Sequence, residues 1–232
     1  MSVPLGGAAV VVLGGETPAG GELARGLERL GASVAGLGVD ALWSAGAVED
    51  ALGGAERRMG AVDGVVLCSV GAEPPSPRAL VDLDPASWDA QVERPLRRTL
   101  ACFQGVHRHL RRRGGSVVLI TPTLSLTGAA GLVPWSAVAE GQRALAKAAA
   151  RSWGRHGVTV NCVAVPGALL VGGAGSPSGG GGLDRPGLPA PALPSPEMGG
   201  DVARVVGSLL CPEWRSVTGM TVPVDGGVWM AP

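Results

Sequence analysis

Few side chains of this sequence could transfer protons or attack a substrate, and their spacing favours no common kind of catalysis. The sequence contains no tyrosine, and Lys147 is its only lysine. Ser125 and Ser136 are candidate nucleophiles, but no histidine lies near either serine in the sequence. Because a serine nucleophile needs a base within hydrogen-bonding distance, we expect no covalent catalysis by serine.

The cysteines form no CxxC pair, and no set of histidine, cysteine and carboxylate residues has the spacing of metal ligands. We therefore expect no metal site and no redox-active cysteine pair. Two of the cysteines lie inside apolar runs, where a cysteine usually serves as a small buried hydrophobic residue. The four cysteines are Cys68 and Cys162, which lie in these runs, and Cys102 and Cys211.

A basic cluster runs from His107 to Arg113. It closes a predicted helix, and cations at the C-terminal end of a helix interact favourably with the helix dipole. His156 follows another predicted helix in the same way. The formal net charge of the whole chain is zero, which argues against a nucleic-acid-binding protein. We interpret the cluster as a solvated helix end.

Short β-branched runs alternate with segments of helical periodicity along the chain. The predicted strands cover residues 8–13, 32–37, 63–69, 115–121, 158–165 and 220–224. The predicted helices cover residues 23–30, 48–59, 88–110, 136–155 and 202–209. The expected apolar face of the long helix comprises Trp88, Val92, Leu96, Leu100, Phe103 and Leu110. The alternation predicts an α/β protein, with one Rossmann-like domain over residues 1–232 built on a doubly wound parallel sheet.

The composition predicts an aliphatic core, one long loop and no membrane segment. With 46% hydrophobic but only 3% aromatic residues, the core must consist mainly of valine, leucine and alanine. The Gly/Pro-rich loop 172–196 offers few side chains to bury, so we expect it to be mobile. The N-terminus lacks a basic region, and its apolar run 8–13 is too short to span a bilayer. We expect a cytoplasmic protein.

Five segments carry a resemblance to a known family, and they occur in the family order. They are VVVLGGETPAGGELARGL, DGVVLCSVG, GSVVLIT, GVTVNCVAVPG and TGMTVPVDGG. Over nearly its whole length, the chain resembles a classical-type short-chain dehydrogenase/reductase. This resemblance implies a Rossmann sheet, assembly as a dimer or tetramer, and NAD(P)-dependent redox chemistry on ketones or alcohols.

The family's cofactor-binding turn, TGxxxGxG, corresponds here to residues 13–20. Gly14 and Gly20 match its first and third glycines, but Pro18 replaces the middle one. Proline has no N–H, whereas that glycine lets the backbone approach the diphosphate. Glu16 adds a negative charge where the phosphate would bind. Although Pro18 also suits the first position of a helix, we expect a vestigial turn and no bound NAD(P).

Two further cofactor-binding features of the family are altered. The second strand should end in a charged residue that selects the ribose, but it is followed by Gly38, and Asp40 comes a residue or two late. The chain has room for only one short connection before the helix at 48–59, so we expect one helix–strand unit of the family to be missing. The NNAG motif is replaced by Cys68, Ser69, Val70 and Gly71, of which only the glycine matches.

The resemblance also locates the family's catalytic tetrad, and none of the four positions carries a catalytic side chain. Pro95 replaces the asparagine, Pro122 the serine, Trp135 the tyrosine and Ala139 the lysine. In the family, the tyrosine is the acid that protonates the developing alkoxide, and the lysine lowers its pKa. An indole N–H donates hydrogen bonds but is no usable acid.

Part of this assignment depends on the alignment. The position at Pro122 could shift, because Thr121, Thr123 and Ser125 are close to it. The absence of tyrosine does not depend on the alignment, and Lys147 is out of register. We therefore expect no tyrosine-dependent carbonyl reduction.

Trp135 has two interpretations. In the first, which we favour, it is a packing residue that fills an abandoned active-site pocket, because large aromatic side chains bury area readily. In the second, it forms the wall of a site for an apolar small molecule.

Three functions remain open. We favour a non-catalytic subunit with a structural or regulatory role, without independent activity, in a homo- or hetero-oligomer with an active reductase of the same fold. Its alanine-rich helix and Trp229 would be available for subunit contacts. The second is a non-redox enzyme of secondary metabolism, such as a cyclase or dehydratase. The third is an atypical NAD(P)H-dependent ketoreductase, which would need a replacement for both the tetrad and the cofactor turn.

Overall fold

The computed structural model describes residues 5–38, 43–68, 77–171 and 190–230. Asp40 and the segment 69–71 lie outside these ranges, as does most of the Gly/Pro-rich loop predicted at 172–196. The expectations that concern them therefore remain predictions.

A parallel six-stranded sheet forms the centre of the molecule, in the order β2-β1-β3-β4-β5-β6. This confirms the predicted Rossmann-like, single-domain α/β fold. The strand order reverses between β1 and β3, which is where ligands bind in open sheets of this kind, at the carboxyl ends of the strands. The strands are β1 (Ala9–Leu13), β2 (Ser33–Leu37), β3 (Gly64–Leu67), β4 (Gly115–Pro122), β5 (Val158–Val165) and β6 (Thr221–Pro223).

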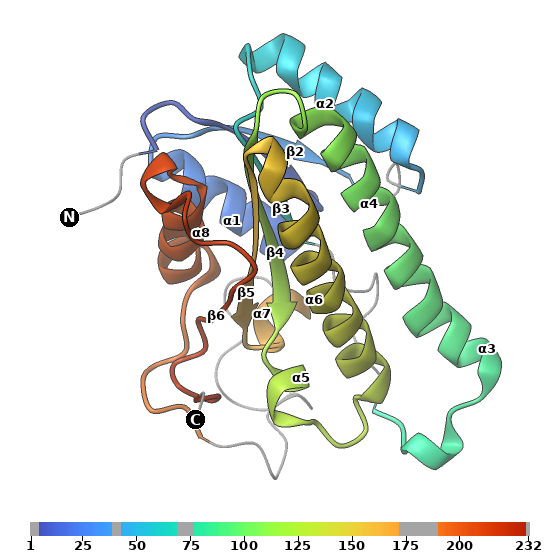
Figure 1. Ribbon diagram of the computed structural model, residues 1–232. Coiled ribbons are helices and arrows are strands. Elements are labelled where there is room, and N and C mark those ends of the chain that lie inside the picture. Colours follow the sequence, from blue (N-terminus) through green and yellow to red (C-terminus); the bar gives the residue numbers. More distant parts are fainter. Residues whose placement is uncertain (1–4, 39–42, 69–76, 172–189, 231–232) are drawn as a thin grey trace.

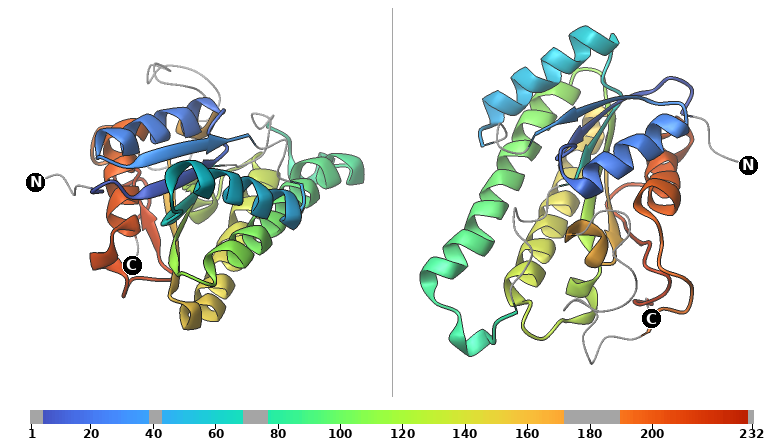
Figure 2. Two further views of the ribbon diagram at one scale, coloured as in Figure 1. Left: turned by 90° about the horizontal axis from the view of Figure 1, so that it is seen from above. Right: turned by 180° about the vertical axis from the view of Figure 1, so that it is seen from behind.

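Helices cover both faces of the sheet (Figures 1 and 2). On one face lie α1 (Pro18–Arg29) and α8 (Ala203–Leu210), and on the other α2 (Ala45–Met59), α4 (Arg94–Leu110) and α6 (Val133–Trp153). The buried core between them is mainly valine, leucine and alanine. Every residue of β4 and β5 is buried, as expected for continuous apolar runs in a sheet covered on both sides.

The sheet agrees with the predicted loss of a helix–strand unit. After β2, the described residues form one helix, α2, before β3. β3 pairs with the opposite side of β1, so β2 is an edge strand of the described sheet. Ser44 caps α2 by accepting a hydrogen bond from the Ala47 N–H, and Gly60 ends the helix with a φ of 83°.

The long helix predicted at 88–110 has three parts. A short α3 (Pro85–Trp88) continues through a π-helical turn (Asp89–Glu93) into α4. Pro95, in the first turn of α4, has no N–H to continue the α-helical ladder across this turn. The predicted apolar face was wrong at Leu100, which is 44% exposed. Residues four apart advance about 40° around a helix, so a series with this spacing turns gradually towards solvent.

Two other features differ from the predictions. α6 begins at Val133, before the predicted start at residue 136, with Pro134 in its first turn. Several one-turn elements were not predicted, because four residues are too few to show a period. They are α5 (Leu124–Thr127), α7 (Ala168–Val171), the 3₁₀ helices Leu80–Asp82, Gly154–His156 and Pro212–Trp214, and the π-helical turn Met198–Val202.

Candidate active site

The candidate site lies at the carboxyl ends of the strands, where the turn between β1 and α1 begins the glycine-rich segment. Gly14 adopts a φ of 90°, a conformation that favours glycine. A Cβ at Gly20 would lie 2.0 Å from the Gly14 carbonyl oxygen, so only glycine fits there. The two glycines that match the family turn therefore allow α1 to pack closely on β1.

Most backbone N–H groups of this turn donate to acceptors within the protein. The Gly14 and Gly15 N–H groups both donate to the Leu37 carbonyl, at 2.8 and 3.2 Å. The Thr17 N–H donates to the Gly14 carbonyl, and the Thr17 hydroxyl accepts from the Gly20 N–H. Pro18, the first residue of α1, has no N–H. Few donors are left to bind a diphosphate at this helix N-terminus.

Glu16 brings a negative charge to the same place. A Cβ at Gly38, just beyond β2, would lie 3.6 Å from the carboxyl group of Glu16. Burial and, to a smaller extent, the negative charge of Glu16 raise the pKa of the Cys68 thiol, just after β3, to about 12. The carboxylate thus acts on the ends of both neighbouring strands, where a phosphate would be repelled.

The four residues that the resemblance aligns with the family tetrad are buried and apolar. Pro95 is buried in the first turn of α4, and Pro122 is the buried last residue of β4. Ala139 is fully buried in α6, one turn after Trp135. Lys147, two turns further along α6, is exposed.

Trp135 is a packing residue, with only 4% of its surface exposed. It forms a small cluster with Leu124 of α5 and Leu132, and the side chains of Leu170 and Val171 from α7 pack against this cluster. A Cβ at Gly167 would lie 3.3 Å from the indole ring, so the ring is also close to the backbone after β5. The indole therefore joins three segments at the carboxyl edge of the sheet, where β4 leads into α5 (Figure 1).

Buried hydroxyl groups remain in this region. The hydroxyl oxygens of Thr121, Thr123 and Ser136 are buried and have no hydrogen-bond partner within the described ranges. Ser125 donates to the Pro122 carbonyl at 3.3 Å. No base is found beside these groups among the hydrogen bonds of the described chain, so they form no nucleophile–base pair of the kind used in covalent catalysis.

A polar link that no sequence pattern predicted joins α6 to α4. Gln142 is fully buried, and its Nε2 donates to the Thr99 hydroxyl at 2.9 Å. That hydroxyl donates to the Pro95 carbonyl at 3.0 Å. A single glutamine in an alanine-rich helix would have been the only signal. The link connects α6 to the first turn of α4, at the Pro95 carbonyl.

The histidines lie elsewhere. His107 stacks on Trp153 with ring centroids 5.0 Å apart, and its Nε2 lies 3.4 Å from Nδ1 of His156. Burial, followed by the charges of His156 and nearby arginines, lowers the pKa of His107. In the predicted basic cluster, Arg113 and His109 lie near Glu56 of α2, at 3.1 and 3.7 Å. The cluster joins α4 to α2.

The family-like segments that remain serve the fold. Asn161 on β5 donates to the Val217 carbonyl and accepts from the Met220 N–H, which fixes the chain entering β6. Asp225 is 2% exposed, and its carboxylate accepts from the N–H groups of Gly227 and Trp229. These contacts show that the TG…VDGG segment has a structural role in this fold.

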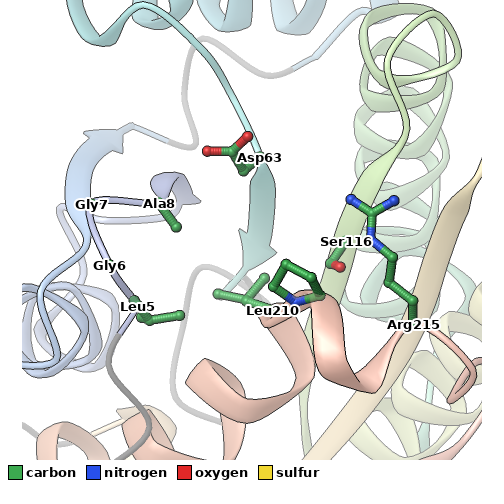
Figure 3. A pocket seen from close by; sticks show the side chains of 9 residues that line it. Leu5, Gly6, Gly7, Ala8, Asp63, Ser116, Leu210 and Arg215 are labelled. Atoms are coloured by element: carbon green, nitrogen blue, oxygen red, sulfur yellow. The ribbon is translucent and has the colours of Figure 1, made fainter.

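An open depression of about 330 Å³ lies at the opposite, amino edge of the sheet (Figure 3). Two of its polar side chains, Asp63 and Ser116, already take part in structural hydrogen bonds. The Asp63 carboxylate accepts from the Ala9 N–H, and the Ser116 hydroxyl accepts from Thr159. We assign it no role.

Three further observations concern the described residues. All four cysteines are buried and unpaired, and burial raises the pKa of Cys102 and Cys162 to about 11, as expected for structural cysteines. Within the described ranges, no three His, Cys, Asp or Glu side chains are grouped to hold a metal ion. In the same ranges, no helix has the length and apolar character needed to cross a lipid bilayer.

The fold and the glycine turn together define a Rossmann-type scaffold of the dehydrogenase kind. A family model described as enoyl-(acyl carrier protein) reductase matches residues 5–229. The chain belongs to the short-chain dehydrogenase/reductase family.

Curated relatives agree with this assignment. The chain is 30% identical over 184 residues to gluconate 5-dehydrogenase of Gluconobacter oxydans, covering 69% of this chain and 71% of that protein. It is 29% identical to the short-chain reductase protein NovJ of Streptomyces niveus, covering 85% and 75% of the two chains. A shorter match, 39% identical over 87 residues, covers 37% of this chain and only 35% of the (2S)-[(R)-hydroxy(phenyl)methyl]succinyl-CoA dehydrogenase subunit BbsD of Thauera aromatica.

Solved structures share the fold. A short-chain type dehydrogenase/reductase from Mycobacterium ulcerans superposes with a TM-score of 0.79 at 21% identity, covering 95% of this chain and 89% of that one. The 3-ketoacyl-(acyl-carrier-protein) reductase from Brucella melitensis, complexed with NADH, gives a TM-score of 0.74 at 16% identity, covering 97% and 99%.

We expect Trp135→Tyr combined with Ala139→Lys to show no NADPH-dependent ketone reduction. General acid catalysis contributes about 10²–10⁴-fold, but only when a hydride donor is bound. Ala139 is fully buried, so the new lysine would also bury a charge. The assay is the loss of NADPH absorbance, with Trp135→Tyr alone as a control for folding. Measurable ketone reduction by the double variant would show that the cofactor turn still works.

Proposed function

We propose that this chain is a non-catalytic subunit of the short-chain dehydrogenase/reductase fold that associates with an active reductase of the same fold. The observation that carries the proposal is the contrast between two sets of residues. Asn161 and Asp225 keep the hydrogen bonds that hold the family architecture. The residues that the resemblance aligns with the tetrad, by contrast, are buried and apolar, and the one aligned with the acid is a tryptophan packed into the core.

The cofactor turn supports the same proposal. Pro18 removes one donor, hydrogen bonds within the turn engage others, and Glu16 places a carboxylate beside the diphosphate position. We propose that the chain binds no NAD(P)H and that any redox activity of the complex belongs to the partner. One relative, BbsD, is itself named as a subunit of a dehydrogenase, which fits a role in a complex.

An apolar strip on α4 and α6 is the proposed contact surface. Leu96 of α4 packs over Gly141 of α6. A Cβ added at Gly141 would lie 2.7 Å from the Leu96 side chain. One turn further along each helix, Leu100 and Ala144 are exposed. A face of exposed leucine and small residues lets another helix pair approach closely. Two helix pairs could bury about 1,600 Å², which is enough for a stable complex.

We expect native mass spectrometry to detect a complex between this chain and a co-expressed reductase of the same fold with an intact YxxxK motif. Leu100→Asp would place a charge in the apolar strip and should weaken the complex at least about tenfold, because burying an unpaired charge in an interface is costly. Val81→Asp is the matched control, since Val81 is 90% exposed on another element. A chain that stays monomeric with every such partner would contradict the proposal.

The buried hydroxyl groups favour a second candidate, a non-redox enzyme in which Thr121, Thr123 and Ser136 contact a substrate. Turnover of a metabolite by the isolated monomer, lost in Thr121→Val, would support it over the first. An atypical reductase is a third candidate, favoured by relatives named as dehydrogenases and reductases. It would require a different acid and a different way of holding the hydride donor.

A further inference from the structure

Arg98 is a buried arginine without an acidic partner among the described residues. It lies on α4 with only 8% of its surface exposed, and its Nε has no hydrogen-bond partner among the described residues. Its guanidinium carbon lies 4.2 Å from the centroid of the Trp43 ring, a cation–π contact. Such a contact offsets only part of the cost of burying a charge, because buried charges are normally paired.

Arg98 lies beside the N-terminus of α2. Trp43 directly precedes Ser44, the capping residue of this 15-residue helix. α4 packs along α2, since an added Cβ at Gly105 would lie 2.6 Å from the Ala45 carbonyl oxygen. Because Arg98 precedes Gly105 by seven residues, about two helical turns, the two share one face of α4.

The first turn of α2 has unused capacity to bind an anion. Ser44 caps the Ala47 N–H, whereas the Ala45 and Gly46 N–H groups have no acceptor within the helix. The first turn contains no acidic residue. A Cβ at Gly46 would meet no atom within 4 Å, so there is room above this turn. The positive end of the helix and a guanidinium that has no acidic partner among the described residues therefore occur together.

We infer that Arg98 and the N-terminus of α2 form a binding site for the phosphate group of a small molecule. The guanidinium supplies donors on one side and the Ala45 and Gly46 N–H groups supply them on the other, while the half-exposed Trp43 ring orients Arg98. This site is separate from the turn between β1 and α1, where Glu16 and Pro18 oppose an anion. It does not depend on the proposed subunit role.

The test is thermal unfolding of the whole chain with inorganic phosphate at constant ionic strength. At a phosphate concentration ten times the Kd, the Tm should rise by about 3–6 °C. Arg98→Met should lose this rise. Its Tm without phosphate should equal or exceed that of the native chain, because the apolar side chain removes a buried charge that has no acidic partner among the described residues. Arg97→Met is the matched control, since Arg97 is the neighbour of Arg98 in the sequence but its guanidinium lies on the exposed side of α4.

A second measurement covers the case in which Arg98→Met fails to fold. In the native chain, phosphate should shift the amide resonances of Ala45 and Gly46. NADP⁺, titrated in parallel, distinguishes the sources of the phosphate: we expect inorganic phosphate to bind and NADP⁺ not to compete with it, whereas Arg98-dependent competition would identify a dinucleotide as the ligand. A phosphate-induced rise in Tm that persists in Arg98→Met, or unchanged Ala45 and Gly46 resonances, would overturn the inference.

Discussion

Titration of the purified chain with NADH or NADPH is expected to give no binding heat at cofactor concentrations up to about 1 mM, the upper end of ordinary enzyme affinities. Each charge-assisted hydrogen bond that is lost weakens binding by about 1.5–3 kcal/mol, or roughly tenfold or more. Pro18 has no N–H to donate to a cofactor. The Gly14, Gly15 and Gly20 N–H groups of the turn already donate to acceptors within the protein. The Glu16 carboxylate adds repulsion.

Variants of the turn separate these causes. Glu16→Gln removes the charge and leaves the hydrogen bonds, whereas Pro18→Gly restores an N–H and leaves the charge. If both causes act, each single variant should bind more weakly than the double variant, which should give the first measurable heat. A micromolar dissociation constant for the unaltered chain would contradict the expectation and favour the atypical reductase.

Trp135→Ala is expected to lower the free energy of unfolding by about 3–5 kcal/mol, because truncating a buried aromatic side chain leaves a cavity. The indole is 4% exposed and contacts three segments at the carboxyl edge of the sheet. Unfolding in urea should show a lower midpoint with an unchanged slope. The Tm should fall by roughly 6–20 °C in a chain of this length.

Trp214→Ala is the matched control, since Trp214 is 45% exposed. Its effect should be within about 0.5 kcal/mol, the usual range for surface substitutions. If Trp135→Ala were as stable as the unaltered chain and bound an apolar molecule in the vacated space, Trp135 would be the wall of a ligand site. The packing interpretation would then be wrong.

Local sequence was sufficient for most of the sheet. The runs at β1, β4 and β5 are apolar and β-branched, and such runs are stable when buried on both faces. Local sequence did not determine the helix boundaries, because helix ends depend on capping and packing. α6, for example, begins three residues before its predicted start, with Pro134 in its first turn.

The sequence by itself determined that the chain lacks the acid needed for tyrosine-dependent carbonyl reduction. A chain without tyrosine cannot use tyrosine as an acid, whatever its fold, and a proline at position 18 cannot donate a backbone hydrogen bond. These conclusions rest on covalent structure. The predicted absence of one helix–strand unit also came from the sequence, because the chain between β2 and β3 is too short to hold it.

Only the tertiary structure decided which side chains meet. Periodicity placed Leu100 on a buried face, but the packing of α4 leaves it exposed. The contact of Arg98 with Trp43 joins residues 55 positions apart, and the packing of Trp135 against α7 joins two elements separated by β5. A sequence pattern indicates the face on which a side chain lies, but its neighbours depend on how the helices pack on the sheet, to which distant parts of the chain contribute.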